Sequence, residues 1–179
     1  MATGRRSGLV PVVRRAGLHD GGVTSAHPAP HRDVRLLGLV ALGGALGSVL
    51  RYAVSLVTPA PGGWPLATLS VNVLGAFLLG FLLEALARRG PETRRLQRLR
   101  LTLGTGVLGG FTTYSSFALE IERLPQDGAA AVAVGYAAAT LVVGTLAAVV
   151  GVALGARVPA STSSRLVRLA EERAEGEQG

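Results

Sequence analysis

The apolar residues of this chain come in long blocks, without the short polar and apolar alternation of an amphipathic strand. A hydrocarbon core of about 30 Å needs roughly 20 apolar residues per helix. Four blocks meet or approach that length: residues 36–57, 66–87, 101–119 and 129–156. The pattern therefore predicts an all-α membrane protein with four transmembrane helices.

Short connections and two flanking segments complete the predicted organisation. Residues 58–63 are rich in proline and glycine, so no helix can cross them. Trp64 follows at a position that suits an aromatic anchor in the membrane interface. We expect a membrane domain over residues 35–157, a disordered cytoplasmic leader over residues 1–34 and a cytoplasmic tail over residues 158–179.

The third block is a poor continuous helix. It holds four glycines, Gly104, Gly106, Gly109 and Gly110, followed by two threonines. At 1.5 Å per residue from Leu101, Gly109 lies roughly 12 Å and Thr112 roughly 16 Å into a slab of about 30 Å. We therefore predict that the third helix is broken near the bilayer midplane.

The basic residues are all arginine, and their placement predicts the orientation of the chain. Six precede the first block, six lie between the second and third, and four follow the last: Arg5, Arg6, Arg14, Arg15, Arg32, Arg35; Arg88, Arg89, Arg94, Arg95, Arg98, Arg100; Arg157, Arg165, Arg168, Arg173. The other two connections contain only Arg123. The positive-inside rule then puts both termini in the cytoplasm. It also explains the net charge of +7 without nucleic acid as a partner.

The residues needed for catalysis are missing from the predicted spans. The chain has no cysteine, so it offers no thiolate nucleophile or metal ligand. The three histidines, His19, His27 and His31, lie in the leader. We therefore do not expect an enzyme.

Small residues recur at four-residue spacing, as Gly43 with Gly47, Gly106 with Gly110 and Gly151 with Gly155. Such pairs let helix backbones approach closely. They serve either packing within one chain or a dimer interface, and spacing alone leaves both open.

Three segments on consecutive blocks, residues 43–52, 72–80 and 104–120, resemble the motifs of the Fluc (CrcB-type) fluoride channel family. The resemblance implies a passive, fluoride-selective channel of the cell inner membrane that exports cytoplasmic fluoride and lowers its toxicity. It also implies an inverted, antiparallel dimer with two pores. A structural Na+ would lie at the dimer interface, bound by the backbone carbonyls of Gly109 and Thr112 of each subunit.

The fluoride pore needs donors without a trapping positive charge, which neutral side chains supply. The candidates on the second and third blocks are Asn72, Thr113, Tyr114, Ser115, Ser116 and Phe117. The resemblance implies two phenylalanines whose ring edges contact the anion. Here the second is Phe117, whereas the first is replaced by Tyr114. Arg51 is expected in the vestibule.

The strong arginine bias favours one fixed orientation, and hence a heterodimer with an inverted homologous subunit; a homodimer is the second reading. This chain could then also be the structural, poorly conducting partner. A small proton-coupled exporter is a further alternative, but it needs a carboxylate deep in the membrane. Glu84 and Glu120 lie near the ends of their blocks.

Overall fold

The computed structural model describes residues 33–160, and within this range the chain is helical with no strand. The elements are α1 (Val34–Val57), η2 (Pro61–Gly63), α2 (Leu66–Ala87), α3 (Arg94–Leu99), η3 (Arg100–Leu108), α4 (Gly109–Phe111), α5 (Tyr114–Gln126) and α6 (Ala130–Gly155). Nearly all of the expected leader and tail, with the three histidines, lies outside the described residues.

Three of the helices, α1, α2 and α6, are long and apolar enough to cross a membrane. This agrees with an all-helical membrane protein. The first helix begins two residues before the expected start because the Asp33 side chain accepts a hydrogen bond from the Arg35 amide and so caps it. Between α1 and α2, Gly62 and Gly63 adopt positive φ values of 61° and 78°, which a turn this tight requires.

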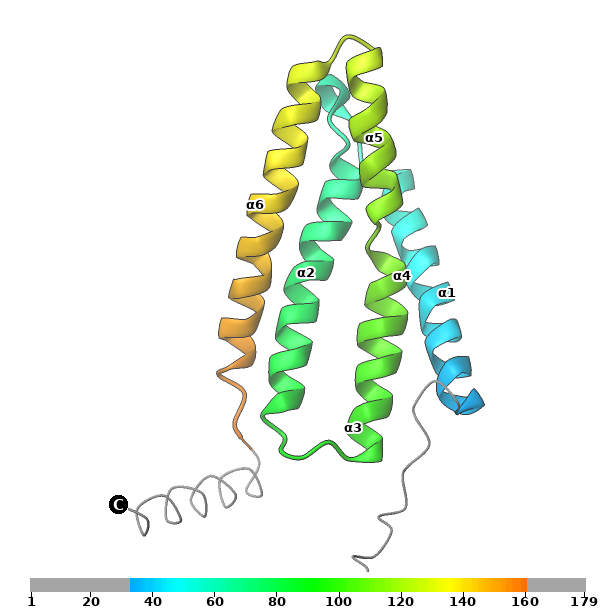
Figure 1. Cartoon of the computed structure of the whole chain (residues 1–179), viewed down its shortest axis with the longest axis vertical. Coiled ribbons are helices and arrows are strands. Elements are labelled where there is room, and N and C mark those ends of the chain that lie inside the picture. The colour runs from blue at the N-terminus through cyan, green and yellow to red at the C-terminus, as the bar shows by residue number, and fades with distance from the viewer. Residues whose placement is uncertain (1–32, 161–179) are drawn as a thin grey trace, which may run out of the picture.

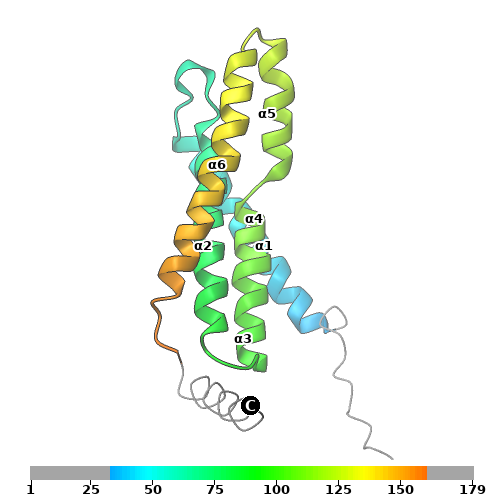
Figure 2. The same ribbon diagram turned by 60° about the vertical axis from the view of Figure 1, so that its left-hand side comes forward.

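The helices form two packed groups, and the segment from α3 to α5 belongs to both of them. Helices α2 and α6 run side by side along most of their length, and α1 packs against η3 and α4 (Figure 1). Beyond α4 the chain changes partner, so that α5 packs against α6 (Figure 2). The segment expected as the third span therefore contacts different neighbours on the two sides of Thr112 and Thr113.

Glycine allows the backbone of α1 to touch that of η3 and α4. A Cβ atom built on Gly47 would overlap the carbonyl oxygen of Val107, and one built on Gly110 would overlap the carbonyl oxygen of Gly44. On Gly43, a Cβ would lie 2.6 Å from the carbonyl oxygen of Thr102. The first two small-residue pairs are thus used for packing within the chain.

The third pair serves the contact between α6 and α2. A Cβ on Gly151 would overlap the carbonyl oxygen of Phe77, and one on Gly155 would lie 2.8 Å from the carbonyl oxygen of Phe81. Of the two readings left open by the spacing, intrachain packing accounts for all three pairs.

One end of the bundle carries most of the described arginines. The start of α1, the end of α2, helix α3 and the end of α6 all lie at this end (Figure 1). Arg35, Arg88, Arg94 and Arg157 belong to these segments. The turns joining α1 to α2 and α5 to α6 lie at the opposite end, so the charge asymmetry of the sequence is also an asymmetry of the fold.

Candidate functional site

The chain leaves helical geometry at Thr112 and Thr113. Their ψ angles are 159° and 124°, both extended, between the end of α4 at Phe111 and the start of α5 at Tyr114. The preceding turns are already loosened, because η3 is a π-helix in which the Gly109 amide donates to the carbonyl of Gly104. Such a break leaves backbone groups without their helical partners, and these groups need others.

The side-chain amide of Asn72 on α2 supplies two of those partners. Its Nδ2 donates to the carbonyl oxygen of Thr113 at 2.9 Å, and its Oδ1 accepts from the Thr113 amide at 2.8 Å. The side chain thus pairs with both backbone groups of one residue, as a neighbouring strand would. Asn72 holds the break in place from the adjacent helix.

The break frees two carbonyl oxygens. In a continuous helix the Thr113 amide would donate to Gly109, and the Ser116 amide would donate to Thr112. Here the first donates to Asn72 and the second to the Thr113 hydroxyl, at 3.2 Å. The carbonyls of Gly109 and Thr112 therefore lose the donors that a regular helix would give them.

Hydroxyl groups cluster at the start of α5. The Thr113 hydroxyl, which caps this helix, lies 3.2 Å from the hydroxyls of both Ser115 and Ser116. Hydroxyls rotate and act as donors or acceptors, so the cluster can present hydrogen atoms to an anion.

A pocket of about 440 Å³ lies on one side of the break. Four of the expected pore residues, Asn72, Thr113, Tyr114 and Phe117, are in its wall together with the two sodium candidates Gly109 and Thr112. The rings of Tyr114 and Phe117 are tilted, with centroids 6.2 Å apart. Tyr114 is 81% exposed, so residues 33–160 leave most of its side chain uncovered.

A second pocket, of about 240 Å³, lies between α1, α2 and the start of α5. Its wall contains Arg51 and the hydroxyl residues Ser48, Ser55, Thr68, Thr113 and Ser116, with Tyr52, Ala67 and Val71. The structure thus brings Arg51 to the hydroxyl cluster. Thr113 borders both pockets, whereas Ser115 is exposed and borders neither of them.

Sequence reasoning missed a polar network beside these pockets. Glu120 accepts hydrogen bonds from the hydroxyls of Thr68, at 2.7 Å, and Tyr136, at 2.6 Å. Tyr136 is fully buried, and its ring lies 5.4 Å from that of Phe117. Glu120 was expected near the end of its block, and both of its oxygens are bonded to side chains of other helices. The sequence feature that could have indicated this network is Tyr136 itself, the single aromatic residue in the block at residues 129–156.

We predict that Tyr136→Phe destabilises the fold by about 1–3 kcal/mol, because it leaves one oxygen of a half-buried carboxylate without its donor. Thermal unfolding in detergent, followed by loss of the monodisperse peak, measures the change. Tyr52→Phe is the control, since Tyr52 is 64% exposed. An equal shift for the two variants would contradict a specific role of the Tyr136 hydroxyl.

The ligands available for a metal near the break are backbone and hydroxyl oxygens. The described residues contain no group of three or more histidine, cysteine, aspartate or glutamate side chains that could hold a metal ion. The freed carbonyls of Gly109 and Thr112 are hard oxygen ligands of the kind that small cations of the alkali and alkaline-earth groups take.

The apolar helices and the polar break between them define a small, all-helical membrane protein with an interrupted helix. The chain belongs to the CrcB-like family (Camphor Resistance, CrcB), whose profile matches residues 38–152. It is 45% identical over 128 residues to "Fluoride-specific ion channel FluC 2" of Leifsonia xyli subsp. xyli, covering 72% of this chain and 88% of that protein. It is 49% identical over 124 residues to "Fluoride-specific ion channel FluC" of Deinococcus radiodurans, covering 66% of this chain and 94% of the relative.

Proposed function

We propose that this chain is a subunit of a passive, fluoride-selective channel that exports cytoplasmic fluoride, and not an enzyme. The observation that carries the proposal is the helix break clamped by Asn72, beside two pockets whose walls include neutral hydroxyl groups and aromatic rings. Relatives at 45–49% identity named fluoride-specific ion channels support it.

The chemistry of the two pockets suits a small, strongly hydrated anion. Fluoride gives up water only where other donors replace it, and a full positive charge in the constriction would hold it too tightly. Hydroxyls of Thr113 and Ser116 and the ring edges of Tyr114 and Phe117 are neutral or only partly positive. Arg51 stands in the wall of the second pocket, where its charge would attract the anion into a vestibule.

In this proposal the segment from α3 to α5 also crosses the membrane, as the third of four spans, with its break near the bilayer midplane. Two subunits in opposite orientation form the dimer, related by an axis in the membrane plane. The 81% exposure of the Tyr114 ring beside the break supports a surface that a second subunit covers. Structural Na+ would be shared at the centre of that interface.

The sodium proposal rests on the freed carbonyls of Gly109 and Thr112. Two such oxygens from each of two subunits would give the ion a set of hard, neutral ligands. The ion would neutralise the partial negative charge of the interrupted helix ends and hold the two breaks together. Asn72 contributes indirectly, because it removes the donor that would otherwise occupy the Gly109 carbonyl.

The arginine-rich end of the bundle would face the cytoplasm, with both termini on that side. Because an inverted dimer needs one subunit of each orientation, we propose a heterodimer with an inverted homologous chain, ahead of a homodimer. Flux is passive: the inside-negative potential drives the anion outward with about 2.3 kcal/mol per charge per 100 mV.

The test is fluoride efflux from liposomes, with valinomycin to balance charge and a fluoride electrode as detector. We expect efflux from this chain reconstituted with its inverted partner, and no chloride efflux under the same conditions. Efflux from the pair but none from either chain alone supports the heterodimer. Lack of fluoride efflux from every combination would contradict the channel.

A structural, poorly conducting role in such a heterodimer is the second candidate. The departure at Tyr114 favours it, because the ring at this position carries a hydroxyl where the family pattern has phenylalanine. Disabling the pore residues of one chain at a time distinguishes the two: a structural half tolerates Phe117→Ile, whereas a conducting half loses flux.

A proton-coupled exporter is a less favourable alternative. Such an exporter needs a carboxylate deep in the membrane that exchanges protons with the substrate. Glu120 is bonded through both oxygens and also borders a pocket at the outer connection beside Trp64. Efflux that does not change when the proton gradient is collapsed would support the channel over the exporter.

A further inference from the structure

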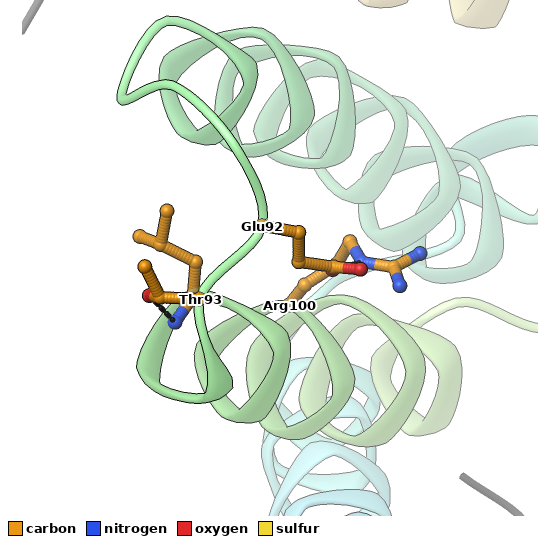
Figure 3. Close-up of polar contacts among 4 residues, drawn as sticks. Glu92, Thr93 and Arg100 are labelled. Carbon is orange, nitrogen blue, oxygen red and sulfur yellow. Dashed lines mark hydrogen bonds and ion pairs between the residues drawn. The ribbon is translucent and has the colours of Figure 1, made fainter. Parts of the chain in front are cut away.

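The connection between α2 and the interrupted span forms a basic surface at the end of the bundle. Six arginines fall within residues 88–100, and two of them pair with carboxylates: Arg88 with Glu84 at 2.9 Å, and Arg100 with Glu92 at 2.8 Å. Figure 3 shows Glu92 reaching along the helix toward Arg100, next to the start of α3. The carboxylates of Glu84 and Glu92 are thus paired with Arg88 and Arg100.

Three arginines of α3 remain without such partners. Arg94, Arg95 and Arg98 are exposed, and within the described residues no hydrogen bond or ion pair of their side chains is found. At 100° per residue they share an arc of about 100° on one side of the helix. Leu96 and Leu99 lie outside that arc and are half-buried. We name Arg94, Arg95 and Arg98 the basic face.

Two interactions near its first residue stabilise α3. Thr93 caps the helix by accepting a hydrogen bond from the Leu96 amide at 3.3 Å, and the Glu92–Arg100 pair spans its length on another side (Figure 3). Between α3 and the end of α2 lies a small pocket of about 140 Å³, lined in part by Leu83, Leu86 and Leu96. This pocket faces α2, on the side of α3 away from the basic face, so the basic face itself is turned away from the bundle.

We propose that the basic face binds the headgroup of an anionic phospholipid. A guanidinium binds a phosphate oxygen pair through two parallel hydrogen bonds, and α3 follows directly where the apolar helix α2 ends, at the level of lipid headgroups. The acyl chains of an anionic lipid keep its phosphate at this level of the bilayer, whereas free phosphate would bind by charge alone. This inference does not depend on which ion the chain conducts.

The experiment compares lipid binding to the full chain by native mass spectrometry with phosphatidylglycerol and phosphatidylcholine. We expect selective binding of phosphatidylglycerol. In the triple variant Arg94→Gln/Arg95→Gln/Arg98→Gln we expect its affinity to fall at least about tenfold, since each basic side chain near an anionic surface contributes about a factor of five. The same substitutions to lysine should lose less than the glutamine variant, because lysine keeps the charge but not the paired hydrogen bonds of the guanidinium. Millimolar inorganic phosphate should not compete effectively.

The matched control is Arg5→Gln/Arg6→Gln/Arg14→Gln, which removes the same charge from the part of the chain that the structure does not describe. We expect it to keep the preference for phosphatidylglycerol. An equal loss in both triple variants, equal binding of the two lipids, or full competition by inorganic phosphate would overturn the proposal. Fluoride efflux in phosphatidylglycerol-free liposomes distinguishes this failure from failure of the channel proposal.

Discussion

Asn72→Leu abolishes fluoride efflux, with a loss of at least about a hundredfold. The substitution removes both hydrogen bonds to Thr113 and leaves a backbone amide and carbonyl without partners in a half-buried position. Each unsatisfied group costs about 1–3 kcal/mol, so the break either refolds toward the helix or collapses. Either change moves Thr113, which borders both pockets. Efflux from liposomes measures the result.

Two variants make the interpretation specific. The first, Ser70→Ala, changes a residue of the same helix two positions earlier. The Ser70 side chain is exposed, and its hydroxyl donates only to the carbonyl of Ala67 in the same helix, so we expect this variant to leave efflux unchanged. Asn72→Asp keeps the acceptor for the Thr113 amide but loses the donor to its carbonyl; we expect a folded protein with strongly reduced flux. Wild-type flux in Asn72→Leu would mean that the clamp is dispensable.

Gly47→Ala prevents stable folding, with an expected loss of several kcal/mol. The added Cβ would overlap the carbonyl oxygen of Val107 and crowd the amide nitrogen of Phe111 at 2.8 Å, and neither backbone atom can turn away as a side chain can. Helix α1 would have to separate from η3 and α4, which costs the packing of the whole contact. Unfolding in detergent, followed by size-exclusion chromatography after heating, measures the loss.

Gly38→Ala is the matched control in the same helix. A Cβ at Gly38 meets nothing within 4 Å, and alanine is a better helix former than glycine by about 1 kcal/mol. We therefore expect Gly38→Ala to be neutral or slightly stabilising. Similar losses in the two variants would show that glycine at position 47 is not required for close packing.

The pattern of apolar blocks was enough to predict three of the long helices. Block length and apolar content identified the regions of α1, α2 and α6, because in a membrane the hydrocarbon thickness sets the length of an apolar helix. Glycine and threonine content indicated where the third span is irregular. The use of the small-residue pairs was not predictable, because the spacing is the same whether the neighbour is another helix or another subunit.

The structure brings several of the candidate site residues close together, but the sequence did not predict their hydrogen bonds. Asn72 was expected to offer its amide to the anion, whereas the structure shows that amide bound to the backbone of Thr113. Which partner an amide takes depends on the distance between helices, which sequence spacing does not give. Tyr136 was overlooked for a similar reason: its partner Glu120 lies sixteen residues away, across the turn between α5 and α6.

The most direct test of the central claim is the reactivity of a single thiol at the break. The chain has no cysteine, so Ser116→Cys introduces the only one, in the wall of the pocket that contains Arg51. Reaction of the reconstituted protein with a small, charged, membrane-impermeant thiol reagent measures access from water. We predict modification within minutes, slowed by millimolar fluoride but not by chloride. A thiol that stays unmodified while the protein conducts fluoride would contradict an anion path along this break.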